Sequence, residues 1–413
     1  MLGKRKTRLT ADGWYYVTIM AFLVAGALLR DINLLLLVFG LMMAALVWHW
    51  RYSAGALKKL HFRRRLPRRV EAGEPLTIDL VAHNGRRRGA AWAIVVEDAV
   101  WREDGTGPQM KVKAAFSRVG PREDVLQTYR GQLTQRGRYV LGPLSVTTRF
   151  PLGLVRRTVA IDSSETLIVV PRLGRLTARW QQHQRELADG SDRAANQHGT
   201  SDGDFHSLRP YRSGDSRRLI HWRTSARQAQ LMVRQFERRQ TRDLAVVLDL
   251  WQPQRPTAAQ RETVELAVSL TATLLADRCR QGGGRIFLGV SGAESSFLFG
   301  PTSSALLSQG IETLALATAS PRDGLGSVLQ RGLEQMPEHA DAVLVSTRKL
   351  RTGHSSPFSS LAIDPRKRGR LDRMLILDAS SDSILDYFEV DAPAAASGAL
   401  RNGQGTITTT NDQ

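Results

Sequence analysis

The sequence predicts three structural classes in series: a two-helix transmembrane hairpin, a β-sandwich of immunoglobulin-like size, and a doubly wound α/β domain. Two long apolar runs lie near the N-terminus, at 14–29 and 32–50. Short runs in which apolar and polar residues alternate follow from about 70 to 170. Beyond residue 244, continuous apolar runs alternate with runs of helical spacing. A chain of 413 residues is also long enough for two or three domains.

The hairpin is expected over 13–50, between a basic N-terminal segment (1–12) and a basic juxtamembrane linker (51–69). Each apolar run approaches the roughly 20 residues that cross a hydrocarbon core. Only Arg30 and Asp31 separate the two runs, so the connection must be tight. Aromatic side chains, which prefer the membrane interface, lie at the outer ends of the pair. They are Trp14, Tyr15, Tyr16, Trp48 and Trp50. The sequence therefore predicts attachment to a lipid bilayer through two helices.

Charge is concentrated beside these apolar runs. The first 69 residues hold thirteen Lys and Arg but two Asp, so they supply +11 of the formal net charge of +19. Positive charge on both flanks of a hairpin favours placing both termini, and the soluble domains, in the cytoplasm. A basic balance that is local in this way argues against nucleic acid as the partner. Cys279 is the only cysteine, which excludes an intrachain disulfide and cysteine-based metal clusters.

The β-sandwich is expected over 70–170. "PLTIDLVAHN" alternates apolar and polar residues and ends at Asn84-Gly85, a turn signal. "AWAIVVEDAV" follows as a second strand. "RGRYVLGPLSVTTRFPLGLVRRTVAI" contains three more strand-like runs, broken by Gly-Pro and by Pro-Leu-Gly. Many short strands without helices indicate a sandwich architecture.

A polar connector (171–203) leads to the α/β domain, expected over 204–391 together with the arginine-rich motif at its start. "LAVVLDL" has the continuous apolar character of a strand buried on both faces. "TAAQRETVELAVSLTATLLADRCRQ" has helical spacing and ends at three glycines. The later runs "RIFLGVSG", "ESSFLFG", "DAVLVST" and "RMLILDAS" read as strands, and "SSALLSQGIETLALAT" and "GLGSVLQRGLEQM" as helices. The segment 392–413 is rich in Ala, Gly, Asn and Thr and is expected to be disordered.

The order of these parts resembles the domain of unknown function 58 family of bacterial proteins. The resemblance is carried by the apolar hairpin, "RGRYVLGPL…FPLGLVRR", "LRPYRSGDSRRLIHWRTSAR…LMVRQFE" and the buried strand that ends in Asp. It implies a C-terminal domain similar to von Willebrand factor type A domains and an inner-membrane location. It also implies a MoxR-type AAA+ ATPase as partner and a transglutaminase-like membrane protein as a second one.

Type A domains often bind Mg²⁺ through Asp-x-Ser-x-Ser after the first strand, with Thr and Asp on later loops. Asp249 matches the first of these ligands. Trp251 and Pro253 stand where the serines belong, and neither has a side-chain oxygen. The later loop, "VLVSTRKL", lacks the usual Asp. We therefore expect no metal site and no cofactor, and we expect Asp249 to remain as a cap or as a hydrogen-bond acceptor at the strand end.

The arginine-rich motif from Leu208 to Glu237 is interpreted as a structural latch that joins the β-domain to the α/β domain, either as a latch alone or as one that also presents a partner surface. Gly214-Asp215 is expected to form a turn, with Asp215 capping a helix that starts near Ser216. Trp222 and Ile220 are expected to be buried, and the arginines to bond carboxylates and carbonyls. The motif and interface residues predicted on this basis are Arg209, Tyr211, Gly214, Asp215, Arg218, Trp222, Ser225 and Arg227.

Two other interpretations of the motif remain open. Asp215, His221 and Ser225 supply the residue types of a hydrolase, although no nucleophile elbow, metal set or phosphate loop accompanies them. Arginines interleaved with aromatic residues also suit nucleic acid, but acidic residues lie among them. The preferred interpretation is a non-enzymatic membrane-anchored scaffold or adaptor that works with the ATPase on a membrane or envelope client.

Overall fold

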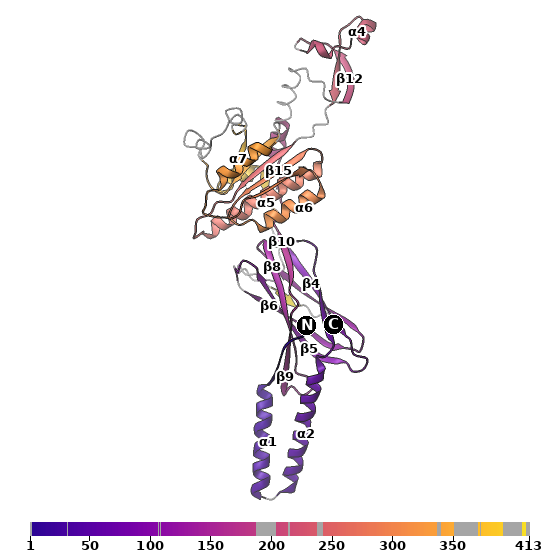
Figure 1. Ribbon diagram of the computed structural model, residues 1–413, viewed down its shortest axis with the longest axis vertical. Helices are drawn as coiled ribbons and strands as arrows, with labels where there is room; N and C mark the ends of the chain where they lie inside the picture. The colour runs from indigo at the N-terminus through magenta and orange to yellow at the C-terminus, as the bar shows by residue number, and fades with distance from the viewer. Residues whose placement is uncertain are drawn as a thin grey trace. The chain divides into compact units, whose positions relative to one another are not determined.

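The computed structural model describes residues 2–30, 32–105, 107, 109–186, 204–213, 215–237, 243–336, 340–350, 371, 373–390 and 407–409 (Figure 1). These residues form two compact units, one made of 1–170 with 393–413 and the other of 171–392. We describe each unit by itself.

Two long helices open the first unit. Helices α1 (Ala11–Arg30) and α2 (Asn33–Ala56) lie side by side as an antiparallel pair (Figure 1). Both are long and apolar enough to cross a membrane, and most of their large apolar side chains are exposed. The two apolar N-terminal helices of the sequence prediction are therefore confirmed, and α2 extends six residues past the expected end at 50.

Two β-sheets pack around one hydrophobic core in the rest of this unit. The first contains β1 (Leu2–Leu9), β3 (Val70–Glu71), β5 (Ala91–Arg102), β6 (Met110–Val119), β8 (Gly137–Thr148), β9 (Val155–Ile161) and β10 (Glu165–Val170). The second contains β2 (Leu60–Arg65), β4 (Pro75–Asn84), β7 (Asp124–Gln132) and β20 (Ile407–Thr409). Leu80 and Ala82 of the second sheet share the core with Val96 and Leu144 of the first.

The segments predicted as a basic N-terminus and a linker contain strands. Residues of β1 pair antiparallel with β9, and β2 pairs antiparallel with β4. In "LHFRRR" the buried positions are Leu60, Phe62 and Arg64, so the run alternates as a strand should. The prediction missed β2 because its third inward-facing residue is an arginine, which is held by Asp98 at 2.7 Å.

One predicted strand break does not occur. Strand β8 runs through Gly142-Pro143, with Leu141 and Leu144 both buried. The register against β5 shifts at this point, between Asp98 and Val100, so a bulge in the ladder takes up the Gly-Pro step. The segment 137–161 therefore forms two strands, β8 and β9, rather than three. In the expected disordered tail, the structure describes only β20, which pairs antiparallel with β7.

The second unit contains a five-stranded mixed sheet in the order β16-β15-β14-β17-β18. Its strands are β14 (Leu244–Asp249), β15 (Arg285–Ser291), β16 (Ser296–Pro301), β17 (Asp341–Ser346) and β18 (Leu375–Asp378). Only β16 runs antiparallel to its neighbour. Each of these strands matches a run predicted from the sequence, which confirms the α/β content of this region.

Helices cover both faces of this sheet (Figure 1). Helices α5 (Ala258–Gln281) and α6 (Ser304–Leu316) share one core with Val246, Leu248 and Leu288. Helix α7 (Leu325–Gln335) packs on the other face, against Ala245, Val247 and Phe287. Since successive residues of β14 point to opposite faces, its continuous apolar run fills both cores.

Smaller elements complete the second unit. Short strands β11 (Arg175–Leu176) and β19 (Phe388–Glu389) pair antiparallel, and a 3₁₀ helix, η2 (Asp382–Asp386), precedes β19. The arginine-rich motif forms a hairpin of β12 (Asp204–Pro210) and β13 (Met232–Glu237). Between these strands lie the 3₁₀ helix η1 (Arg217–Leu219) and the two-turn helix α4 (Trp222–Gln228).

Candidate functional site

The strand order of the sheet reverses between β14 and β17, and the carboxyl ends of these two strands lie side by side. From β14 the chain crosses through α5 to β15 on one side, and later returns to β17 on the other. In open α/β sheets, ligands are bound outside the carboxyl ends of the strands at such a reversal. Asp249 is the last residue of β14, and Ser346, its partner in the register, is the last residue of β17.

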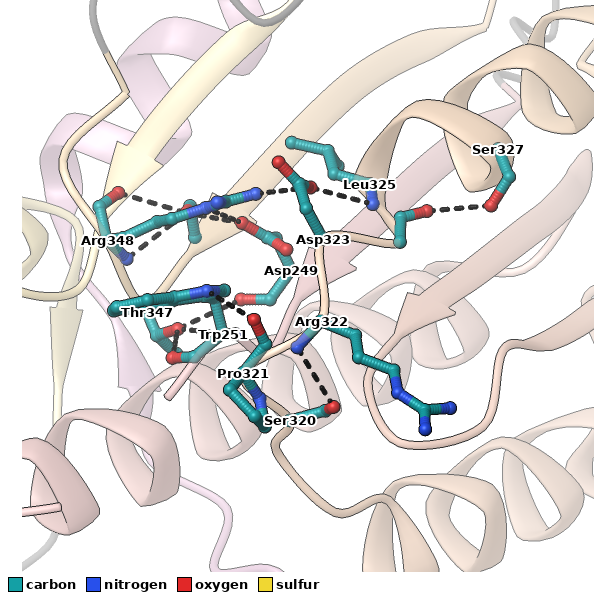
Figure 2. A network of polar contacts seen from close by, with 12 residues as sticks. Asp249, Trp251, Ser320, Pro321, Arg322, Asp323, Leu325, Ser327, Thr347 and Arg348 are labelled. Carbon is teal, nitrogen blue, oxygen red and sulfur yellow. Dashed lines mark hydrogen bonds and ion pairs between the residues drawn. The ribbon is translucent and has the colours of Figure 1, made fainter. Parts of the chain in front are cut away.

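Arg348 lies at this point and joins two carboxylates (Figure 2). Its Nε donates to Oδ2 of Asp249 at 3.0 Å, and its NH2 group donates to Oδ1 of Asp323 at 2.7 Å. The Ser346 hydroxyl donates to the same Asp249 oxygen at 3.0 Å. Asp249 is 1 % exposed, so its charge depends on these partners.

Thr347 and Trp251 close the site on one side (Figure 2). The Thr347 hydroxyl donates to the Trp251 carbonyl at 2.6 Å and accepts from the Trp251 amide at 2.9 Å. The Trp251 indole donates to the carbonyl of Pro321 at 3.2 Å, and the Arg348 guanidinium lies 5.8 Å from the ring centroid. The loop that follows β14 is thereby fixed to the loops that follow α6 and β17.

The two carboxylates at this point differ in their proton affinity. Burial raises the pKa of Asp249 above its ordinary 3.8, against the opposing effect of Arg348. The hydrogen bond from Arg348 lowers the pKa of Asp323, which is more than half exposed. The Arg348 guanidinium therefore binds one carboxylate with a raised pKa, Asp249, and one with a lowered pKa, Asp323.

These residues do not fit the magnesium site that the family resemblance brings into question. The Oδ2 oxygen of Asp249 is bonded to a guanidinium, and Trp251 contributes a ring in place of a hydroxyl. Mg²⁺ needs an octahedral set of oxygens. The structure thus shows a fixed arginine cation beside Asp249, and Asp249 acts as the strand-end acceptor that the sequence predicts.

The second candidate site is the arginine-rich motif, whose turn is held by one bidentate ion pair. Two nitrogens of Arg209 donate to the two carboxylate oxygens of Asp215, at 2.7 and 2.8 Å. Oδ2 of Asp215 also accepts from the amide of Arg212 at 2.8 Å. The hydrogen bond from Arg209 lowers the pKa of Asp215, so the pair is ionised at neutral pH.

A second set of bonds holds α4 against the hairpin. The hydroxyl of Ser225, which is buried, donates to the carbonyl of His221 at 3.0 Å and accepts from the amide of Met232 at 2.8 Å. The helix begins after His221, whose Nδ1 accepts from the amide of Thr224 at 3.2 Å. Ile220 is buried and pairs with Val233 of β13.

Two expectations for the motif are wrong. Asp215 does not cap a helix, because its carboxylate is engaged by Arg209 and the backbone of Arg212, and Ser216 precedes η1 with no side-chain cap. Trp222 is 66 % exposed rather than buried. The first turn of α4 turns this side chain outward, whereas Ile220, two residues earlier, faces β13.

The remaining predicted residues divide into those that hold the motif and those on its surface. The Tyr211 amide donates to the carbonyl of Leu231 at 2.8 Å and helps close the hairpin. Gly214 lies outside the described residues. Arg218 and Arg227 are exposed and form no ion pair with another described residue. Other arginines of the motif are exposed too, namely Arg212, Arg217, Arg223 and Arg234.

The hydrolase interpretation requires Ser225, His221 and Asp215 to bond to one another in sequence. The Ser225 hydroxyl instead contacts a backbone carbonyl and a backbone amide, and the Asp215 carboxylate contacts Arg209. The histidine ring accepts a helical amide. Each group already has a structural partner, so the described geometry assembles no nucleophile and base here.

Comparison with known proteins bears on the motif and the sheet together. Residues 207–349 match the family model "Protein of unknown function DUF58". This match confirms the resemblance, and it spans both candidate sites, from β12 to Arg348. A curated relative, "Uncharacterized protein YeaD" from Bacillus subtilis (strain 168), is 26 % identical over 197 residues. These residues are 46 % of this chain and 46 % of the relative, so the chain spans about half the length of the curated relative that it matches.

Solved structures give only distant likenesses. The alkylpurine DNA glycosylase AlkC of Pseudomonas fluorescens is similar over 29 % of this chain and 33 % of its own, with 16 % identity and a TM-score of 0.21. A CARDB domain from Pyrococcus furiosus is similar over 27 % of this chain and 87 % of its own, with 18 % identity and a TM-score of 0.17. Neither likeness bears on function.

Proposed function

We propose that this protein is a non-enzymatic, membrane-anchored scaffold whose arginine-rich motif docks a partner protein. One observation carries the proposal: Trp222, a large apolar side chain, is 66 % exposed on a helix that buried hydrogen bonds fix in place. Exposed arginines surround it in the sequence. Aromatic and arginine side chains are the usual anchors of protein–protein interfaces. A rigid mount reduces the entropy lost on binding.

The anchor is the α1–α2 pair. Helices of 20 and 24 residues are about 30 and 36 Å long at ~1.5 Å per residue, which suits a hydrocarbon core of ~30 Å. Most of their large apolar side chains are exposed, as lipid contact requires. With basic residues on both flanks, we place the hairpin in a bacterial inner membrane, with both soluble units on the cytoplasmic side.

The fold of each unit is part of the proposal. We assign the first unit to the immunoglobulin-like sandwiches and the sheet of the second to the von Willebrand factor type A-like domains. Support for the second assignment comes from the helices on both faces and from Asp249 at the end of the central strand. The cation beside Asp249 is Arg348, so partner binding by this domain needs no metal.

The partner that we propose is a MoxR-type AAA+ ATPase, and this identity rests on the family resemblance. A transglutaminase-like membrane protein is a second candidate partner on the same basis. The arginines of the motif suit an acidic surface on the ATPase, and exposed charges of this kind mainly set the association rate and its salt dependence. Trp222 would supply most of the binding free energy.

The test is a pull-down with the full chain in detergent and a MoxR-type ATPase of the same organism, in ATP and in ADP. We expect binding that Trp222→Ala weakens at least about thirtyfold, as for a hot-spot residue. The matched control is Trp92→Ala, since Trp92 is another exposed tryptophan, 40 % exposed, in the first unit. Absence of binding in both nucleotide states, or equal loss in both variants, would contradict the proposal. If the motif instead bound an oligonucleotide with steep salt dependence, the nucleic-acid interpretation would replace it.

A further inference from the structure

An unusual pair of like charges lies beside the helical hairpin. In the antiparallel pairing of β1 with β9, Arg8 stands directly opposite Arg156. Directly opposite residues in such a pair project from the same face, with Cβ atoms roughly 5 Å apart, and like charges at this position are destabilising. Both arginines are exposed, and neither forms an ion pair with an acid in the part of the chain that the structure describes.

Contacts fix this pair to the first turn of α1. The Thr10 hydroxyl donates to the carbonyls of Gly153 and Leu154, at 2.7 and 3.0 Å, and the Thr10 amide donates to the carbonyl of Leu154 at 3.0 Å. Gly13 lies so close to Leu154 that an added Cβ would clash with its carbonyl oxygen. The position of strands β1 and β9 relative to the start of α1 is therefore fixed.

Aromatic side chains mark that height as the membrane interface. Trp14 and Tyr15 are exposed on the first turn of α1, and Trp48 is exposed near the end of α2. From Trp48 a series of ring contacts runs through Tyr52 to Phe150, with centroids 5.9 and 5.6 Å apart. Amphipathic rings gather at the level of the lipid headgroups.

Arg8 precedes the first helical residue, Ala11, by three positions. At ~3.3 Å per residue of extended chain, Arg8 lies within roughly 10 Å of the first helical residue, and its long side chain can extend toward lipid headgroups at that end of the helix. Asp12 is the nearest acid in the sequence, but it lies in the first turn of α1, where the helix dipole stabilises it. A phosphate between Arg8 and Arg156 would accept from both guanidinium groups and remove their repulsion.

We infer that Arg8 and Arg156 form a binding site for the phosphate of an anionic phospholipid at the membrane surface. The inference rests on the proposed membrane anchoring and goes beyond it, because topology needs only positive charge near the helices and not two arginines in register. The site makes the stability of the first unit depend on the lipid that surrounds it.

The experiment compares the full chain in nanodiscs of phosphatidylcholine alone and with phosphatidylglycerol. Wild type should melt higher in the anionic discs and should retain phosphatidylglycerol on mild delipidation, as counted by native mass spectrometry. In the double variant Arg8→Gln/Arg156→Gln, the affinity for phosphatidylglycerol relative to phosphatidylcholine should fall roughly thirtyfold. Each cation near an anionic surface contributes roughly fivefold to that ratio. The double variant should melt as high as wild type, or higher, in phosphatidylcholine, because the repulsion is gone.

The control is Arg218→Gln with Arg227→Gln, which removes the same charge from the motif and should keep the lipid preference. Equal retention of both lipids by wild type, or an unchanged preference in the Arg8/Arg156 variant, would overturn the inference. If millimolar inorganic phosphate stabilised the detergent-solubilised protein as much as the anionic lipid does, the site would be one for free phosphate instead. Failure to enter either disc would contradict the anchoring itself, and so is distinct from the loss of preference alone.

Discussion

The guanidinium of Arg348 lies 3.0 Å from the carboxylate of Asp249, a residue 99 positions earlier in the chain. This pair joins the carboxyl end of β14 to the loop that follows β17, where the strand order of the sheet reverses. The Asp249 side chain is 2 % exposed and the Arg348 side chain 22 %, so most of the interaction is shielded from water. Removal of one partner from such a pair leaves a buried charge without compensation.

Arg348→Ala should therefore destabilise the second unit by about 3–5 kcal/mol at neutral pH, lowering its melting temperature by roughly 10 °C. The stability of Arg348→Lys should lie between those of wild type and Arg348→Ala, because an ammonium lacks the planar fork that reaches both Asp249 and Asp323. Thermal unfolding of the detergent-solubilised chain measures the effect. Asp323→Ala is the control, since its side chain is 57 % exposed and should cost less than about 1 kcal/mol. Equal melting of wild type and Arg348→Ala would show that the pair adds nothing to the fold.

The two carboxylates that share Arg348 should titrate on opposite sides of 3.8. Burial raises the pKa of Asp249, so the folded state holds the proton of this carboxyl more tightly than the unfolded state does. As pH rises above 3.8, ionisation of Asp249 therefore lowers the free energy of unfolding. Asp323 has its pKa lowered by the hydrogen bond from Arg348, and it contributes stability that is lost as pH falls below 3.8. Carboxyl ¹³C NMR of Asp-labelled protein, assigned with Asp249→Asn and Asp323→Asn, measures both. Shifts in the same direction would contradict the assignment.

Added Mg²⁺ should leave the melting temperature unchanged, because a guanidinium is bonded to the one carboxylate that matches the metal motif. A ligand that binds only the folded state raises stability by an amount that grows with its concentration above Kd. The measurement is melting temperature against Mg²⁺ from micromolar to millimolar. Stabilisation that saturates at low concentration and disappears in Asp249→Ala would show a metal site after all.

Much of the α/β unit could be predicted from sequence because its signals are local. The helix α5 begins after Thr257, whose side chain accepts from the Gln260 amide in a capping box, and it ends at Gly282. The strand β14 is buried at every position, as its apolar run predicts. Propensity, capping and burial all agree in these elements, and the predicted bounds hold to within one or two residues.

The candidate site at the sheet end could be predicted only in part. The sequence points to Asp249, which ends an apolar strand and matches the first ligand of the type A metal motif, but Arg348 and Asp323 lie in loops that only the folded sheet brings to it. Strand β2 was missed for a related reason, since Arg64 is buried by its bidentate bond to Asp98. Both the sheet-end site and strand β2 depend on pairing between residues far apart in the sequence, which a local sequence pattern does not reveal.

Trp222 shows the opposite error. The sequence predicts that Ile220 and Trp222 are both buried between two domains, but only Ile220 is buried. The backbone turns between them, from the bridge at Ile220 into a helix that begins at Trp222, so the two side chains part. Exposed tryptophan is a feature of interaction surfaces more than of cores, which is why the correction strengthens the interface interpretation.

Truncation to alanine should destabilise the motif at Ser225 but hardly at Trp222. Ser225→Ala leaves the buried amide of Met232 without an acceptor, which should cost about 1–3 kcal/mol and loosen the hairpin. Trp222→Ala should change stability by less than about 0.5 kcal/mol, as surface substitutions do. The rate of trypsin cleavage after the exposed arginines of the motif reports this locally. Ser216→Ala, at a serine whose side chain caps no helix, is the control. Faster cleavage in Trp222→Ala than in Ser225→Ala would reverse our view of which residue holds the motif.

The orientation of the hairpin gives the last prediction. Basic residues flank it on both sides, at Lys6 and Arg8 before α1 and at Arg51, Lys58 and Lys59 at and after the end of α2. The short link between the helices carries only Arg30 and Asp31, whose charges cancel. Both ends should therefore remain in the cytoplasm and the link should face the other side. A reporter that is active only in the periplasm should give no signal when fused after Leu57, and a strong signal when fused after Arg30. Reversal of the two signals would place both soluble units outside the cytoplasm, where an ATP-dependent partner could not reach them.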